Sequence, residues 1–315
     1  MKLKKPYFWD LTKPNFLSYL LIPFSLPIIL RNFLFKFLKR EKSSSIKTIC
    51  VGNIYLGGTG KTPLTLKIYE ILKKLDYKVA TVKKNHSNQK DEQLLLKQKT
   101  SLIIAKSRKN AIHQGLNHNY DFLIFDDGLQ ETQIDFNIKL VCFKSKNWVG
   151  NGQLIPAGPM REKISSLKRF DAVFLNGNSI NFQEIENQIQ DINSNIKIFK
   201  TFYKISNIQK YDLNSKYLIF SGIGNPSDFK NILLENKFNV AREIIFPDHY
   251  KYNENDFEKI QDNAKNENLK ILTTEKDYMK IPEKYKKEID FLSIDLIIQN
   301  ENKLIDYFKK LIWKL

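Results

Sequence analysis

The sequence predicts an α/β fold in which a mainly parallel β-sheet carries helices on both faces. From residue 46 onward, short runs rich in β-branched and aromatic residues alternate with helical stretches. This alternation is typical of βαβ units, whose parallel strands are buried on both sides of the sheet. A glycine-rich loop also joins the first apolar run to the first helical stretch, so a candidate binding loop accompanies the fold prediction.

The first predicted domain covers residues 43–205 and contains the glycine-rich loop. Its strands are expected at six apolar runs, with helices in several of the gaps between them. The strands are predicted at 48–52, 79–83, 102–105, 122–126, 139–143 and 172–176, and the helices at 62–75, 92–97 and 108–116.

A second, smaller α/β domain is predicted over residues 216–299, after a polar linker at 206–215. Residues 300–315 carry a further helix, and packing of this helix against the first domain is left open. The strands are expected at 217–220, 240–246, 270–273 and 291–294, and the helices at 227–235, 254–266 and 302–313.

The composition is that of a folded globular chain of 315 residues, with 42% hydrophobic and 27% charged residues. Two cysteines, Cys50 and Cys142, lie in apolar runs and read as buried thiols. They are too few for a disulfide scaffold or a cysteine zinc site. The four histidines form no H-x-x-x-H pair, which argues against a histidine metal cage.

The charge balance is strongly basic, with 51 Lys and Arg against 34 Asp and Glu, a net charge of +17. Such a surplus indicates an anionic partner: a nucleic acid, a membrane surface or a phosphorylated substrate. Lysines scattered over a solvated surface explain much of it equally well. A nucleic acid is not expected, because no basic helix with interleaved aromatic residues occurs beyond the N-terminal segment.

The N-terminal segment, residues 1–42, carries nine Lys and Arg against two acids and encloses the apolar run 16–30. As a helix, the 15 residues of that run would span roughly 22 Å. A bilayer core needs about 20 residues, so the run is too short to cross it. Pro23 and Pro27 interrupt it. The pattern favours a broken helix at a membrane surface. A core or partner helix, a spanning segment and a signal peptide are the alternatives, although no small-x-small cleavage site follows Leu30.

The glycine-rich loop lies within residues 51–63, between a strand and a helix. Its glycines allow a tight turn with inward N–H groups, which together with a helix N-terminus bind phosphate oxygens. The strict G-x-x-x-x-G-K-T pattern would have Gly where this chain has Tyr55, so the match is to a variant; a glycine-rich structural turn is the alternative. The expected nucleotide-binding residues are Gly57, Gly58, Thr59, Gly60, Lys61 and Thr62.

Four side chains give this loop its predicted chemistry. Lys61 is expected to reach the β- and γ-phosphates of a nucleotide and to act in catalysis, and the Thr62 hydroxyl is expected to bind Mg²⁺. Asp126 and Asp127 end a strongly apolar strand. Acids at such a strand end hold the metal in P-loop enzymes. The fold is therefore predicted to be of the P-loop NTPase type, with a nucleotide and Mg²⁺ as cofactors.

A kinase also needs a proton acceptor and positive charge for the molecule that receives the phosphate. Asp91, Glu92 and His249 are candidate acid–base residues, although residues of these types are also common at caps and surfaces. The loop 150–162 is rich in Gly and Pro and ends in Arg-Glu. Within it, Asn151 and Arg161 are candidates for substrate binding, since arginine clamps phosphate with two parallel hydrogen bonds. A long connecting loop with a surface salt bridge is the alternative.

The order and spacing of these motifs resemble the tetraacyldisaccharide 4′-kinase family, over most of the chain. The residues that carry the resemblance are 52–63, Asp91-Glu92, 126–130, 150–162, 222–226, Asp248-His249 and 273–277. The resemblance implies a peripheral or monotopic kinase on the cytoplasmic face of the bacterial inner membrane. Its reaction would move the γ-phosphate of ATP to the 4′-hydroxyl of tetraacyldisaccharide 1-phosphate and give lipid IVA. It also implies that Asp91 and His249 form a catalytic pair, and that the N-terminal helix docks on an anionic membrane.

Two positions depart from the family pattern. Lys84-Asn85-His86 stands where the family usually has Arg-Gly-Tyr, so a charge is kept but the guanidinium fork is lost. Glu131 stands where the family usually has His. Both departures leave the phosphate loop, the metal acids and the candidate pair of the family pattern in place.

Two nucleotide-dependent alternatives compete with a kinase. A GTPase or metallochaperone would need a guanine-reading motif, and in residues 274–277 the lysine directly precedes the aspartate, which is the wrong order. A membrane-bound ATPase switch without a small acceptor would leave the loop 150–162 and His249 without a role. The sequence does not indicate the oligomeric state or the acyl-chain preference.

Overall fold

The computed structural model describes residues 5–35, 37, 41–42, 46–85, 90–131, 134–177 and 181–313, and the side chains of residues 41, 42, 90, 91 and 313 lie outside this description. The chain divides into two compact units. Unit 1 comprises Met1–Asn85, Lys99–Phe202 and Ile297–Leu315, and unit 2 comprises His86–Gln98 and Tyr203–Leu296. The predicted first domain had included residues 86–98, which the structure groups with unit 2.

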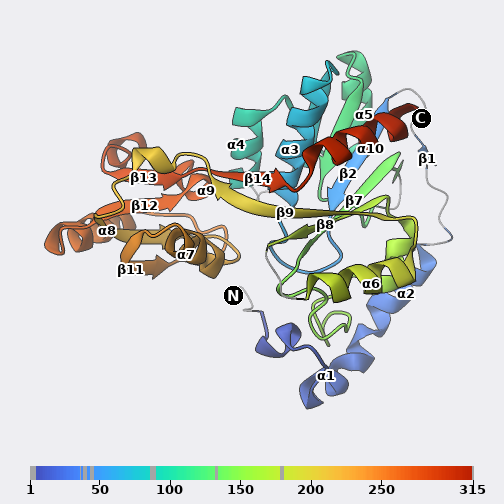
Figure 1. The fold of residues 1–315 in the computed structure, drawn as a ribbon, viewed down its shortest axis with the longest axis horizontal. Coiled ribbons are helices and arrows are strands. Elements are labelled where there is room, and N and C mark those ends of the chain that lie inside the picture. The colour runs from blue at the N-terminus through green and yellow to red at the C-terminus, as the bar shows by residue number, and fades with distance from the viewer. Residues whose placement is uncertain are drawn as a thin grey trace. The chain divides into compact units, whose positions relative to one another are not determined.

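Unit 1 is built on an eight-stranded sheet in the order β14-β9-β8-β7-β2-β5-β3-β4 (Figure 1). Neighbouring strands from β9 to β4 are parallel, so the predicted α/β class is confirmed. The strands are β2 (Lys47–Gly52), β3 (Val79–Lys84), β4 (Leu102–Ala105), β5 (Phe122–Asp126), β7 (Ile138–Lys144), β8 (Ala172–Asn176), β9 (Lys197–Ile205) and β14 (Ile294–Ile298). A separate pair joins β1 (Glu41–Lys42) to β6 (Ile134–Asp135).

Helices cover both faces of this sheet, because the buried strands present apolar side chains in both directions. Val173 and Leu175 of β8 share one core cluster with Ile185 and Ile189 of α6 (Phe182–Ile192). Phe174, between them, stacks on Phe199 of β9. In Figure 1, α6 and α10 (Glu301–Trp313) lie on opposite sides of β8 and β9.

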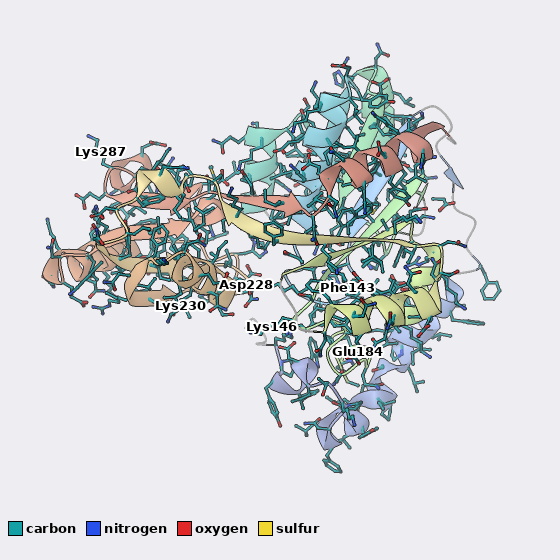
Figure 2. All side chains as sticks on the ribbon, viewed as in Figure 1. Phe143, Lys146, Glu184, Asp228, Lys230 and Lys287 are labelled. Atoms are coloured by element: carbon teal, nitrogen blue, oxygen red, sulfur yellow. The ribbon has the colours of Figure 1, made fainter. Side chains whose placement is uncertain are left out.

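Unit 1 also contains α3 (Lys61–Lys74) and α5 (Arg108–Asn117). An ion pair of 2.8 Å between Lys67 Nζ and Glu301 Oε2 joins α3 to α10. Phe143, fully buried near the end of β7, lies in the interior of this unit (Figure 2). The core of unit 1 is therefore a sheet between two helical layers, with the phosphate loop at the β2–α3 junction.

Unit 2 has a four-stranded parallel sheet in the order β11-β10-β12-β13. Alternate residues of β10 face two clusters: Tyr217 packs with Phe229 of α7, and Leu218 packs with Phe257 of α8. Lys287 extends outward from this unit (Figure 2). The elements are β10 (Lys216–Ser221), β11 (Asn239–Ile245), β12 (Lys270–Thr274), β13 (Ile289–Leu292), α4 (Lys90–Lys99), α7 (Pro226–Glu235), α8 (Glu254–Asn266) and α9 (Glu275–Tyr278).

The prediction of a single strand at 291–294 is wrong. The chain leaves the four-stranded sheet after Leu292 and enters the eight-stranded sheet at Ile294. Ser293, between them, donates its backbone N–H to Asn207 Oδ1 and accepts from Ser206 N, each at 3.0 Å. These bonds divert the backbone of Ser293 from both ladders. Helix α6 and strand β9 were not predicted, although Ile185, Ile189 and Ile192 of α6 recur at helical spacing.

The N-terminal segment is helical with a break, as predicted. It consists of α1 (Phe16–Leu21), a 3₁₀ turn (Ile22–Ser25) and α2 (Leu26–Leu34), and the prolines stand at the starts of the second and third pieces. Residues Phe16–Leu34 are long and apolar enough to cross a membrane, and only 11% of them are buried. A core helix would be mostly buried. The other 3₁₀ helices are Tyr7–Asp10, Ile164–Arg169, Ile208–Lys210 and Glu283–Tyr285.

Candidate active site

The glycine-rich loop is shaped by two backbone positions and one buried side chain. Gly57 and Gly60 have φ angles of 136° and 91°, which strain any residue with a Cβ. Asn53 donates through Nδ2 to Gly57 O at 3.1 Å and to Thr59 Oγ1 at 2.9 Å. Gly58 lies in the same loop with open space around the position of a Cβ. Asn53 therefore supports the loop from its buried side, while the loop at Gly58 is open to its surroundings.

Asp126 ends β5 beside the start of α3. Its Oδ2 accepts from Thr62 Oγ1 at 3.0 Å and from Lys83 Nζ at 2.6 Å. A hydroxyl and carboxylates are the hard oxygen donors that Mg²⁺ prefers, so these residue types fit the predicted metal. Within the described part of the chain, no group of three or more His, Cys, Asp or Glu side chains is placed to hold a metal ion. Mg²⁺ would therefore need phosphate and water for its remaining ligands.

Asp127 brings two cations to the same place. Its carboxylate lies 3.7 Å from Lys61 Nζ and 3.4 Å from Arg161 Nη1. Burial alone would raise the pKa of Asp127, but the charges of Lys61 and Arg161 outweigh it and hold that pKa below its usual range. The structure thus brings the predicted residues Lys61, Asp127 and Arg161 together around one ionised carboxylate.

The two departures from the family pattern fall close to these residues. Glu131 pairs with Arg108, which also donates through Nη2 to the backbone oxygen of Asp127 at 2.6 Å. An acid in place of the usual His is thus neutralised by an arginine. Lys84 is exposed at the end of β3, and Asn85 N donates to Ala105 O at 3.1 Å. His86 lies outside the described residues.

The loop 150–162 is attached to the N-terminal segment. Gly150 has a φ of 58°, and a Cβ there would stand 2.1 Å from Trp9 O, so only glycine fits. Asn151 is buried, and its Nδ2 donates to Phe8 O at 3.2 Å and to Ser18 Oγ at 2.9 Å. Its amide is thus used within the chain. The substrate-binding role of Asn151 stays a prediction, and the geometry gives it a part in shaping the loop.

Three further hydrogen bonds, all near 3.0 Å, continue this attachment. Trp9 Nε1 donates to Pro156 O, Ser25 Oγ to Leu154 O, and Asn32 Nδ2 to Arg161 O. The N-terminal segment therefore braces the loop that carries Arg161, in addition to presenting apolar side chains to solvent.

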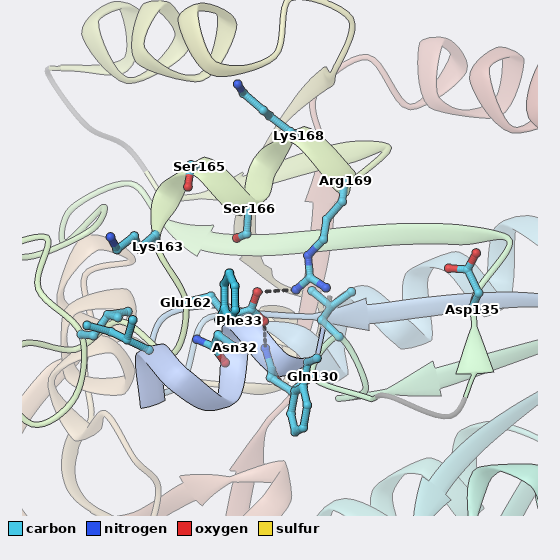
Figure 3. A pocket seen from close by; sticks show the side chains of 14 residues that line it. Asn32, Phe33, Gln130, Asp135, Glu162, Lys163, Ser165, Ser166, Lys168 and Arg169 are labelled. Carbon is cyan, nitrogen blue, oxygen red and sulfur yellow. Dashed lines mark hydrogen bonds and ion pairs between the residues drawn. The ribbon is translucent and has the colours of Figure 1, made fainter. Parts of the chain in front are cut away.

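A cavity of about 890 Å³ lies in unit 1, beside α2 and the end of this loop (Figure 3). Glu162 anchors its wall by pairing with Arg169 and accepting from Gln130 Nε2 at 3.1 Å. Gln130 Oε1 in turn accepts from Arg161 Nη1 at 3.3 Å. The cavity is thus connected through two side chains to the carboxylate of Asp127. Its other lining residues are Ile29, Asn32, Phe33, Phe35, Leu129, Asp135, Leu154, Lys163, Ser165, Ser166 and Lys168.

His249 is held in unit 2 through its backbone. It has a φ of 56°, and its N–H donates to Gly222 O at 3.1 Å. The N–H of Gly222 donates to the buried carboxylate of Asp277 at 2.9 Å. Asp277 also accepts from Thr274 Oγ1 at 2.8 Å and pairs with Lys280 Nζ at 2.6 Å. A chain of contacts therefore fixes His249 to the motif at the start of α9.

Lys276 connects the neighbours of the two predicted acid–base residues. Its Nζ lies 3.7 Å from Glu92 Oε1 and 3.9 Å from Asp248 Oδ1. Asp91 precedes Glu92 in α4, and its side chain lies outside the described residues. We expected Asp91 and His249 in different domains, with a site in the cleft between them. In the structure both belong to unit 2, because α4 groups with this unit.

Sequence reasoning missed three residues of these sites: Asn53, Lys83 and Asp277. The two lysines at the end of a mostly apolar strand, Lys83 and Lys84, were a detectable signal. Asp277 belonged to the segment 273–277, which was noted for its resemblance to the family and as a failed guanine reader, but without a role for the aspartate itself. Nothing in the sequence marked Asn53 as the support of the phosphate loop.

Comparison with known proteins decides the family. The profile of the tetraacyldisaccharide-1-P 4′-kinase family matches residues 16–312. The chain belongs to this family. A tetraacyldisaccharide 4′-kinase of Pelagibacter ubique is 45% identical over 313 residues, 99% of each chain. Another, of Rickettsia bellii, is 34% identical and covers 98% of this chain and 99% of its own. The resemblance predicted from the motifs is confirmed.

A solved structure supports the fold of this kinase family member. LpxK from Aquifex aeolicus, crystallised in complex with ATP, is 24% identical with a TM-score of 0.71. The match covers 95% of this chain and 99% of that one. The predicted architecture, a P-loop-type α/β sheet with a second α/β region and an apolar N-terminal helix, is confirmed at the level of the fold.

Proposed function

We propose that this chain transfers the γ-phosphate of ATP to the 4′-hydroxyl of tetraacyldisaccharide 1-phosphate, which gives lipid IVA. One observation carries the proposal beyond family membership. Lys61 and Arg161 converge on the carboxylate of Asp127, at the mouth of a preformed phosphate loop. Phosphoryl transfer requires cations close to the position where charge develops on the transferring phosphoryl group.

The nucleotide would be held by the loop from Gly57 to Thr62, with its phosphates at the N-terminus of α3. Thr62, Asp126 and Asp127 would hold Mg²⁺, which supplies positive charge to the β- and γ-phosphate oxygens when bound. Lys61 and Arg161 would orient the same oxygens. Asp127 keeps both cations in place, because it is ionised at neutral pH.

The acceptor hydroxyl needs a base, and Asp91 and His249 remain our candidates. Asp91 would accept the 4′-hydroxyl proton, and His249 would orient and tune the carboxylate. Their common membership of unit 2 and the contacts of Lys276 with Glu92 and Asp248 support this pairing.

The lipid would be met by the N-terminal segment at the cytoplasmic face of the inner membrane. Phe16, Phe24 and Leu30 are 58–80% exposed. Burial of such apolar side chains at the boundary between lipid headgroups and acyl chains is favourable. The basic residues of this segment would meet anionic headgroups. The cavity beside α2 is a candidate site for the apolar part of the substrate, because it lies between that helix and the loop of Arg161.

The test is an assay of purified protein with Mg-ATP and tetraacyldisaccharide 1-phosphate, in which the product mass is measured. Addition of one phosphoryl group to the lipid is the expected result. ATP hydrolysis with unmodified lipid would instead favour the membrane-bound ATPase switch. Omission of the lipid is the control, since a kinase should then turn over ATP far more slowly.

A further inference from the structure

Lys83 is a charged side chain inside the core of unit 1. It stands near the end of β3, after four buried residues, and only 2% of its side chain is exposed. Its Nζ lies 2.6 Å from Oδ2 of Asp126, whose side chain is fully buried. Lysine is almost never fully buried unless it is paired, because the ammonium loses its hydration. The partner of Lys83 here is the acid that we assign to the metal.

The contact between Lys83 and Asp126 lies at the proposed Mg²⁺ site. The oxygen of Asp126 that meets Lys83 also accepts from Thr62 Oγ1 at 3.0 Å. The ammonium therefore lies at the carboxylate and near the hydroxyl that are expected to bind Mg²⁺. The Lys83 ammonium and a bound Mg²⁺ would repel each other, and solvent screens this repulsion weakly because the carboxylate of Asp126 is buried.

We propose that Lys83 is a positioning residue, an internal counter-ion that holds Asp126 against Thr62 and weakens the affinity of the nucleotide-free protein for a divalent cation. It follows that Mg²⁺ enters with the phosphates of the nucleotide, whose negative charge offsets the ammonium. This inference rests on the proposed metal site of the kinase.

The direct test measures the affinity of the nucleotide-free, full-length chain for Mn²⁺. Electron paramagnetic resonance of the free ion reports how much Mn²⁺ remains unbound. The Lys83→Met variant keeps the length of the side chain and removes its charge. We expect it to bind Mn²⁺ at least tenfold more tightly than the wild type. The control is Lys200→Met, which removes another lysine ion pair, 2.9 Å to Glu186, from the same unit. It should leave Mn²⁺ affinity unchanged.

Equal Mn²⁺ affinity in Lys83→Met and wild type would overturn the role of Lys83. Lipid phosphorylation by the wild type in that case would leave the proposed function standing. Loss of Mn²⁺ binding in an Asp126→Asn variant identifies the measured site as the one in question. Mn²⁺ binding that survives Asp126→Asn would also overturn the inference.

A second measurement covers the case in which Lys83→Met is too unstable for the Mn²⁺ titration but still shows a melting transition. A buried carboxylate without its counter-ion is strongly destabilising, whereas removal of both charges is tolerated better. The double variant Lys83→Met/Asp126→Asn should therefore melt at a higher temperature than Lys83→Met alone. A double variant no more stable than the single one would show that the two side chains are not coupled, and the inference would fail.

Discussion

The two regions to which we assign the chemistry are held in place by different forces. Around the phosphate loop of unit 1, charged side chains hold one another: Lys61 and Arg161 at Asp127, and Lys83 at Asp126. In unit 2, the backbone N–H of His249 is linked through Gly222 to the buried carboxylate of Asp277, and its Nε2 lies 3.7 Å from Asp248 Oδ2. The first arrangement is suited to binding a charged ligand, and the second to fixing the direction of one side chain.

Because of this difference, we expect the first region to control both nucleotide affinity and rate, and the second to control the rate of transfer alone. Removal of a charge from the first region changes the field that phosphates and metal experience, so nucleotide affinity should fall with the rate. Loosening of the second region leaves that field untouched. It should lower the rate of transfer and spare the affinity for ATP.

The largest effect is expected at Lys61. Lys61→Ala should lower kcat about a thousandfold, because it removes the charge that stabilises the transferring phosphoryl group. Thr62→Ala should follow closely, through weaker Mg²⁺ binding. Steady-state kinetics with lipid substrate, together with ATP titration, measures both effects. Wild-type turnover in either variant would refute the nucleotide site.

Substitutions of the acid–base pair come next. Asp91→Ala and His249→Ala should each cost about 10²–10⁴ in kcat, the usual contribution of a general base, with ATP affinity preserved. Residues that act as one unit are not additive, so the double variant should be little worse than the poorer single one. Fully multiplicative losses would show that Asp91 and His249 act independently.

A smaller effect is expected from the support of His249. Asp277→Asn keeps the shape of the side chain but weakens its contacts with Gly222 N and Lys280, so His249 should lose its fixed position. We expect a fall in kcat of about tenfold with unchanged ATP affinity. Asp212→Asn, at an exposed position of unit 2, is the matched control. A fall in ATP affinity as large as the fall in kcat would contradict the division between the two regions.

The smallest effect is expected at the membrane surface. Phe24→Glu should lower partition into anionic vesicles roughly tenfold, since a buried Phe contributes about 1.5–3 kcal/mol. Leu234→Glu, which alters an exposed apolar residue of unit 2, is the control. This substitution is a cleaner test than deletion of residues 1–40, which would also remove Trp9 and Ser25 from the loop 150–162. Unchanged vesicle binding would indicate that the segment serves only as a brace.

Much of the fold followed from local patterns. Strands such as Phe122–Asp126 and helices such as Glu254–Asn266 were predicted with the observed bounds, because their apolar runs and caps are continuous in sequence. The break at Ser293 was not predictable, since it depends on Asn207, which is 86 residues away. The placement of α4 in unit 2 was missed for the same reason.

Motifs marked Lys61 and Asp126 as candidates, and the structure places Asp126 beside Thr62, the residue that follows Lys61. The site was less predictable where the role depends on neighbours. Asn151 looked like a ligand-binding loop residue, and its amide is occupied by Phe8 O and Ser18 Oγ. Lys83 looked like the last residue of a strand, and only its distance to Asp126 gives it a role.

The most direct test compares Lys61→Ala and His249→Ala by ATP affinity and by single-turnover phosphorylation of the lipid, on the same protein preparations. We predict that Lys61→Ala loses both, whereas His249→Ala binds ATP like the wild type and loses at least a hundredfold in transfer. A His249→Ala protein that loses ATP affinity as severely as Lys61→Ala would contradict this account. So would one that transfers phosphate to the lipid at the wild-type rate.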